Sequence, residues 1–162
     1  MRVCTALTLY LALALACTVL QVLPADVQVE SARADLAAEG FEFDADVRFR
    51  YHRYAACDGM ACADVALIGE RRTILLAPEA FESPGQLRAT LLEVWERYRE
   101  PRPGSVPDLA RGALRVIRDG ERVGVREPYI LRRAHHVYRQ LYLELPSDER
   151  ADLPDPDKLQ FP

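Results

Sequence analysis

The sequence predicts a small α+β protein, in which an antiparallel sheet of two to three strands packs with about four helices after a cleavable signal peptide. The N-terminus has the build of a secretion signal. Residues 41–51 alternate apolar and polar side chains, as a half-buried strand does. The second half of the chain carries apolar residues at helical spacing behind clear helix-start signals.

The N-terminal segment is interpreted as a signal peptide spanning residues 1–25. Arg2 supplies its positive end, residues 3–22 carry no charge, and residues 7–16 form a dense apolar run. Residues 23–25, Leu-Pro-Ala, then break the helix and end in a small residue. We therefore expect cleavage before Asp26 and a secreted or periplasmic protein.

Two alternatives remain for the same segment. A run of roughly twenty apolar residues is long enough to span a bilayer, although polar residues interrupt it and no basic residues follow it. The sequence Ala-Leu-Ala-Cys at 14–17 also resembles a bacterial lipobox. Cleavage after Ala16 would then leave Cys17 as a lipidation site, and the protein would be lipid-anchored at the cell envelope.

Cleavage after Ala25 leaves 137 residues (162 minus 25). We expect one α+β domain over 26–145, followed by a Pro- and Asp-rich tail over 146–162 whose composition predicts poor order.

The cysteine pattern predicts one disulfide. Outside the signal segment the chain has only Cys57 and Cys62, and an even pair in an oxidising compartment favours a bridge. Gly59 allows the tight loop. A metal or redox site is the alternative, but the pair lacks the C-x-x-C spacing and a second cysteine pair.

The first part of the domain reads as a helix followed by strands. Residues 26–39 have helical apolar spacing, and Gly40 stands where a helix C-cap is expected. The alternation over 41–51 predicts a strand with one wet face, hence an antiparallel sheet. Strands are also predicted at 63–68 and 72–77, joined by a Gly69-Glu70 turn.

The second part reads as three helices. Ser83, Pro84 and Gln86 form a capping box before a helix over about 84–99. A further helix runs from Ser105 to Gly120, although Asp119-Gly120 is alternatively a hairpin turn between 115–118 and 121–125. The last helix spans 128–143.

Residues 73–98 carry a weak resemblance to a known family. A strand, a short turn and a helix reading Leu-Leu-Glu-Val-Trp-Glu-Arg-Tyr over 91–98 are similar to the core of small zincin-type metallopeptidases, whose helix reads Leu-Leu-His-Glu-x-x-His. Glu93 and Arg97 stand in the positions of the two histidine ligands, and Val94 in that of the catalytic glutamate. Because ligands and base are absent, the resemblance implies a diverged relative without activity.

Three residues are candidates for catalysis: Glu93, Glu96 and His135. Glu93 and Glu96 lie one helical turn apart and could share a site, but an ordinary solvated face with a Glu93–Arg97 ion pair explains them equally. His135 and His136 are adjacent and point about 100° apart on a helix. At most one of them could therefore join His52 and a carboxylate around a metal.

These observations favour an exported, non-enzymatic domain with a binding or structural role and with no cofactor or metal. One alternative is a hydrolase, either metal-dependent with an unusual ligand set or a diverged zincin relative. A second is a module that binds an anionic envelope component through its Arg-rich helices, since residues 86–139 hold 12 basic and 7 acidic residues. The competing interpretation of that charge is pairing within the molecule, and nucleic acid is not an expected partner.

Overall fold

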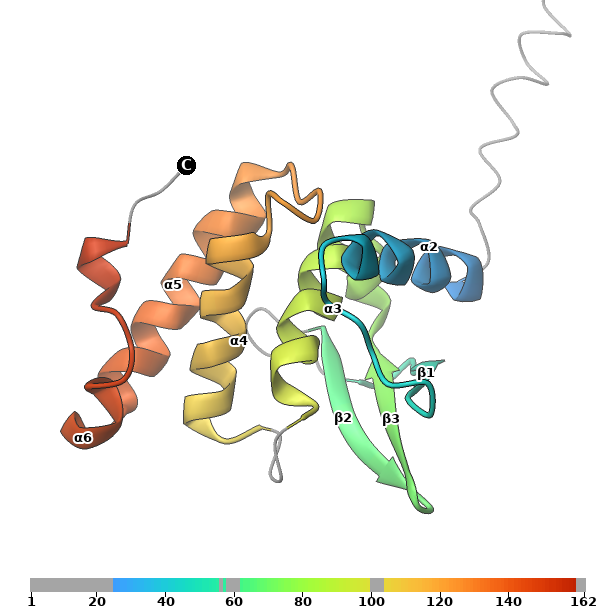
Figure 1. Ribbon diagram of the computed structural model, residues 1–162, viewed down its shortest axis with the longest axis horizontal. Coiled ribbons are helices and arrows are strands. Elements are labelled where there is room, and N and C mark those ends of the chain that lie inside the picture. Colours follow the sequence, from blue (N-terminus) through green and yellow to red (C-terminus); the bar gives the residue numbers. More distant parts are fainter. Residues whose placement is uncertain (1–24, 56, 58–61, 100–103, 160–162) are drawn as a thin grey trace, which may run out of the picture.

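The computed structural model describes residues 25–55, 57, 62–99 and 104–159 (Figure 1). Residues 1–24, which include the lipobox cysteine Cys17 and all of the predicted signal peptide except its last residue, lie outside the described residues. Within these ranges, no helix has the length and apolar character needed to cross a membrane.

The sheet has three strands: β1 (Arg48–Tyr51), β2 (Ala63–Ile68) and β3 (Arg71–Leu76). Their order is β1-β3-β2, with β2 antiparallel and β1 parallel to β3. The α+β class is confirmed, and so is the hairpin, which turns at Gly69 with φ 65°. The prediction of an antiparallel sheet is wrong for β1. Alternation reports that one face is buried, but it does not report which strand lies alongside or in which direction.

The predicted strand over 41–51 is shorter than expected, since only Arg48–Tyr51 pairs with β3. A turn closed by the Val47 N–H and the Asp44 carbonyl interrupts the alternating segment. Phe41 and Phe43 nevertheless point inward, with ring centroids 5.1 Å from Trp95 and 5.2 Å from Tyr98 respectively. The alternation therefore predicts the burial of Phe41, Val47 and, in part, of Phe43 and Phe49, but Ala45 in the turn and Tyr51 at the end of β1 are exposed.

The described residues form four long helices: α2 (Ala25–Ala38), α3 (Pro84–Arg97), α4 (Val106–Asp119) and α5 (Pro128–Glu144). The predicted ends of these helices are set by interactions of residues at the ends themselves. Gly40 ends α2 with φ 88°, and the Ser83 and Ser105 hydroxyls accept the backbone N–H of Gln86 and Asp108. The hairpin alternative around Gly120 is wrong, because α4 continues to Asp119 and the residues after it form turns.

Helix α3 is the centre of the molecule. It lies between the sheet and α4, with α5 on the far side of α4 and α2 packed against α3 (Figure 1). Its apolar residues Leu87, Leu91 and Val94 join Ile74 and Leu76 of the sheet in the main core. Any group on α3 is therefore close to the sheet, to α4 or to α2.

The C-terminal tail folds back onto the helices within the described range. Helix α6 (Ser147–Arg150) and the short 3-10 helix η2 (Pro156–Lys158) follow α5. The hydroxyl of buried Tyr138 donates to the Pro154 carbonyl at 2.6 Å, and Leu153 and Leu159 pack on the α4–α5 cluster. Composition predicted poor order here, whereas residues 146–159 supply a hydrogen-bond acceptor and apolar cover for α5.

Candidate functional site

A buried ion pair occupies the C-terminal part of α3. Arg97 Nε lies 2.6 Å from Glu93 Oε1, one helical turn away, and both residues are almost fully buried, at 4% and 2% exposure. Arg97 Nη2 also donates to the carbonyl of Ala63 on β2 at 3.1 Å. The predicted i,i+4 pair is confirmed, but the prediction of a solvated face is wrong, because α4 and β2 cover these two side chains.

Glu93 is enclosed on its other side by Gly112 of α4. A Cβ at position 112 would lie only 2.8 Å from Glu93 Oε1, so this glycine leaves the room that the carboxylate fills. The Glu93 Oε2 atom has no hydrogen-bond partner among the described residues. Burial raises the pKa of Glu93 to about 7 against the opposing effect of the Arg97 charge.

Glu96, the second candidate carboxylate, pairs with a different partner. Its Oε2 accepts from Arg115 of α4 at 2.9 Å, and Arg115 also pairs with Asp119 at 3.0 Å. Glu93 and Glu96 are therefore committed to separate arginines, one buried and one half-buried. The structure does not bring them together as a pair of acids around one substrate.

The histidines are also dispersed. His135 Nε2 lies 2.9 Å from the Pro156 carbonyl of the tail, while His136 is exposed and His52 lies beside Tyr54. No group of three or more His, Cys, Asp or Glu side chains within the described ranges is placed to hold a metal ion. The unusual ligand set that the sequence allowed is thus not assembled.

The predicted disulfide is confirmed. The sulfur atoms of Cys57 and Cys62 are 2.03 Å apart. Cys62 is fully buried at the start of β2, where Gln86 of α3 approaches its sulfur at 3.8 Å. The bridge therefore joins Cys57 to the residue that precedes β2, beside the N-terminal end of α3.

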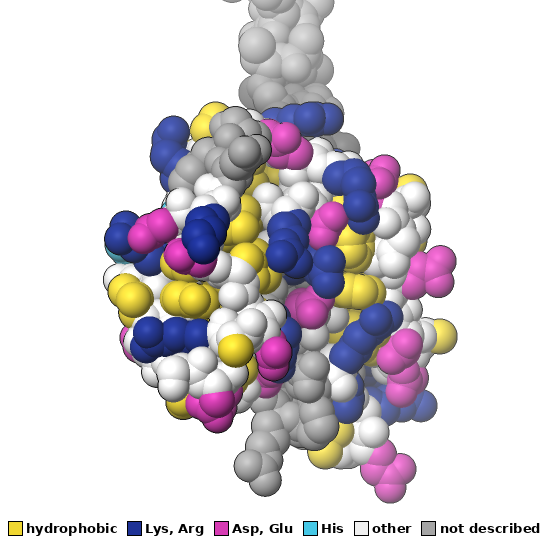
Figure 2. Space-filling view, turned by 60° about the vertical axis from the view of Figure 1, so that its left-hand side comes forward, with side chains coloured by type: hydrophobic (Ala, Val, Ile, Leu, Met, Phe, Trp, Pro, Cys, Tyr) yellow, Lys and Arg dark blue, Asp and Glu magenta, His cyan; other side chains and the backbone are white. Residues whose placement is uncertain are grey.

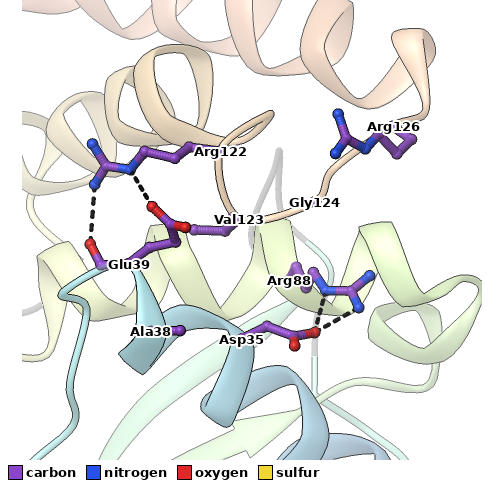
Figure 3. Close-up of a pocket in the computed structure, with 8 residues that line it drawn as sticks. All are labelled: Asp35, Ala38, Glu39, Arg88, Arg122, Val123, Gly124 and Arg126. Carbon is purple, nitrogen blue, oxygen red and sulfur yellow. Dashed lines mark hydrogen bonds and ion pairs between the residues drawn. The ribbon is translucent and has the colours of Figure 1, made fainter.

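A cleft of about 460 Å³ lies between α2, α3 and the loop that joins α4 to α5. Figure 3 shows Asp35 and Glu39 on the α2 side, Arg88 on α3, and Arg122 and Arg126 on the loop above. The loop turns back through Gly124, whose φ of 89° favours glycine and which packs against the Arg88 side chain.

The cleft is lined by more positive than negative charge. Arg88 donates from Nε and Nη2 to Asp35 Oδ2 at 2.8 and 2.6 Å, and Arg122 pairs with Glu39 at 3.1 Å. Arg126 makes no side-chain hydrogen bond or ion pair with any described residue. Among the lining residues three arginines face two carboxylates, and Asp119 outside the lining also pairs with Arg122 at 3.1 Å. The positive charge available to an anion is therefore local to Arg126.

The cleft was not predicted from the sequence, because its residues come from three separate stretches of the chain, 35–39, 88 and 122–126. In the sequence Arg88 looks like a solvated helix residue, and Arg126 like a residue of the connection between two helices. The only local signal is the turn chemistry of Gly120 and Gly124, which indicates a loop but not what that loop faces.

Most arginines of the helices are paired. On the face shown in Figure 2, basic side chains are spread over the surface with acidic ones between them. The pairs on or between the helices and the tail are Arg88–Asp35, Arg97–Glu93, Arg111–Asp108, Arg115–Glu96, Arg122–Asp119 and Arg139–Asp157. Six of the twelve basic residues of the stretch 86–139 are therefore paired with carboxylates of the same molecule.

Comparison with known proteins adds no relative: no family model, no curated protein and no solved structure matches this chain.

Proposed function

We propose that this chain is an exported, non-enzymatic binding domain whose ligand site is the cleft between α2, α3 and the α4–α5 loop. The observation that carries the proposal is Arg126, which lines the cleft beside Arg88 and Arg122 without a described partner of its own. A guanidinium that no carboxylate neutralises is available for a ligand anion, and its planar fork suits carboxylate or phosphate groups.

The ligand is a small anion. The cleft is open to solvent and of a size for a small molecule. Asp35 and Glu39 hold Arg88 and Arg122 in place through their ion pairs, so that the arginines are oriented before a ligand arrives. Pre-oriented donors lose less side-chain entropy when they bind.

The test is titration of the purified protein with citrate and, separately, with inorganic phosphate, followed by calorimetry. We expect Arg126→Gln to weaken the binding of the preferred anion roughly tenfold, because a hydrogen bond to a charged group is lost. Arg132→Gln, the same change on an exposed arginine of α5, is the control. Equal affinity of the two variants for the anion would show that the cleft is not the binding site.

The non-enzymatic part of the proposal is supported by the closed Glu93–Arg97 pair. Glu93 has a pKa near neutrality, as a general acid does, but α4 covers it and it lines neither the cleft nor its rim. Metal analysis of the purified protein, with melting curves in zinc and in EDTA, tests the hydrolase alternative. Stoichiometric metal and a chelator-sensitive melting temperature would overturn the non-enzymatic assignment.

The zincin resemblance enters as a second candidate, a diverged relative without activity. One observation favours it: β3, a short 3-10 helix η1 (Pro78–Phe81) and α3 follow one another as the resemblance requires, and the two residues at the ligand positions lie on the same side of α3, in contact with each other. Homologous sequences test it. Histidine, glutamate and histidine at positions 93, 94 and 97 in relatives would support descent, and unrelated residues there would contradict it.

Export is supported by the disulfide and by the build of the N-terminus. The intact mass of the mature chain tests it. A mass beginning at Asp26 is the expected result, a lipidated mass beginning at Cys17 would indicate an envelope anchor, and an unprocessed chain would contradict export.

A further inference from the structure

The sheet carries arginines that the rest of the molecule does not neutralise. Arg48 and Arg50 of β1 and Arg71 of β3 are exposed. No carboxylate among the described residues lies within ion-pair distance of any of the three. This distinguishes them from most arginines of the helices, which are held by acidic partners.

The three arginines share one face of the sheet. Arg48 and Arg50 are paired in register with Thr73 and Leu75, and Arg71 stands two residues before Thr73 on the same strand. Side chains alternate between faces along a strand, so all three point away from the core face that holds Ile74 and Leu76. Arg72, on the opposite face from Arg71, instead donates to the Tyr98 carbonyl at the end of α3.

Beside these charges is an exposed apolar tip. Leu67 and Ile68 end β2 with 71% and 45% of their surface exposed. Ile68 is paired in register with Arg71 on the arginine face, whereas Leu67 is paired with Arg72 on the opposite face, so the two side chains flank the end of the hairpin. In Figure 1 the β2–β3 hairpin extends beyond the helices, so that this tip projects from the body of the protein. Projecting aliphatic side chains next to arginines suit a boundary between water and hydrocarbon.

We propose that this end of the sheet, called the hairpin face and made of Arg48, Arg50, Ile68 and Arg71 with Leu67 on the other side of the tip, docks tip-first on the surface of an anionic phospholipid bilayer. The arginines pair with headgroup phosphates, and the two aliphatic side chains enter the acyl boundary below them. A hydrated anionic polymer satisfies the arginines equally well, but it does not bury Leu67 and Ile68. This combination of charge and apolar surface favours lipid.

Two carboxylates lie near the hairpin face and limit its affinity. Asp64 is on β2 opposite Leu75, and Glu70 is in the hairpin turn. The proposal therefore predicts that Glu70→Gln tightens binding to anionic vesicles severalfold, since one repulsion is removed. A decrease in binding would contradict the placement of the turn at the membrane.

The experiment is co-sedimentation of the full chain with vesicles of phosphatidylcholine alone and of equimolar phosphatidylcholine and phosphatidylglycerol. The double variant Arg48→Gln/Arg50→Gln is expected to bind the anionic vesicles about thirtyfold more weakly, at about fivefold per basic residue. The double variant Arg118→Gln/Arg132→Gln removes the same charge from exposed positions of α4 and α5 and is expected to bind as the parent does. Equal loss in both variants would show a non-specific charge effect and overturn the proposal.

The apolar tip separates lipid from other anions. Leu67→Gln is expected to weaken vesicle binding and to leave the weak attraction to a single-stranded oligonucleotide unchanged. All altered residues are exposed, and coincident melting curves would show that the fold is kept. Loss of oligonucleotide binding in Arg48→Gln/Arg50→Gln with unchanged vesicle binding would assign the face to nucleic acid instead. The anion titration of the cleft is independent of this outcome, because the two surfaces share no residue.

Discussion

Arginine serves different purposes in the helical part of the molecule and in its sheet. On α3, Arg97 is buried, bound to Glu93 and tied to the backbone of β2. On β1, Arg48 and Arg50 are exposed, and no described carboxylate lies within ion-pair distance of them. The first arrangement costs desolvation and is coupled to folding. The second is a solvated charge whose removal leaves the folded core unchanged.

The largest effect should come from breaking the buried pair. Arg97→Met leaves Glu93 buried without its partner, and we expect a loss of about 3–5 kcal/mol in the free energy of unfolding at a pH above the pKa of Glu93. Arg48→Met, the matched change in the sheet, should alter it by less than about 0.5 kcal/mol. Urea denaturation of the two variants measures both values. Similar losses would contradict the distinction between the two regions.

The next effect is the pH dependence of stability. The folded-state pKa of Glu93, about 7, lies above its ordinary value of 4.5, so between these values the folded chain holds a proton that the unfolded chain releases. Stability from this group is fully present below pH 4.5 and is lost as the pH rises through about 7, by about 3 kcal/mol. Urea midpoints across this range should fall with pH.

Two substitutions isolate the carboxyl responsible. Glu93→Gln removes the titrating group and should flatten the pH dependence over this range, whereas Glu96→Gln on the same helix should keep it. A parent protein whose stability rises across the range, relative to Glu93→Gln, would show that the Arg97 charge outweighs burial.

A smaller effect should follow from filling the space beside Glu93. Gly112→Ala introduces a Cβ 2.8 Å from Glu93 Oε1, and we expect a loss of about 1–3 kcal/mol from overpacking. An ordinary glycine inside a helix would instead gain up to about 1 kcal/mol on this change. The same substitution in the Glu93→Ala background should cost less, since the side chain it meets is gone. Additive losses in the double variant would contradict the contact.

The smallest effect is expected for the partly exposed pair of the cleft. Arg88 and Asp35 side chains are 24% and 42% exposed, so Arg88→Gln should lower the unfolding free energy by less than about 1 kcal/mol. Thermal melts of this variant and of Arg97→Met, measured together, compare the contributions of the two ion pairs to stability. A loss at Arg88 comparable to that at Arg97 would show that the cleft pair is structural.

Elements with local causes were predictable. Ser83 and Ser105 begin α3 and α4 because their hydroxyls accept backbone N–H groups within the same turn. Gly40 ends α2 for a similar local reason, and Cys57 and Cys62 bridge a short loop. Each depends on neighbours in the chain, so the sequence contains the information needed.

The candidate site was predictable only in part. The spacing of Glu93 and Arg97 indicates an ion pair, but not that Gly112 and the Ala63 carbonyl enclose it. Desolvation depends on residues that are distant in the chain, and so does the raised pKa of Glu93. The cleft around Arg126 was missed for the same reason.

The sequence by itself determined that this protein is α+β, where its long helices begin, and that its cysteines pair. Only the tertiary structure decided that β1 lies parallel to β3, that the tail covers α5, and which arginines are buried, paired or left free. The helix ends and the disulfide depend on residues only a few positions apart, so the sequence alone indicates them. The burial and pairing of a charge depend on which distant surfaces meet it, and that is settled only when the chain has folded.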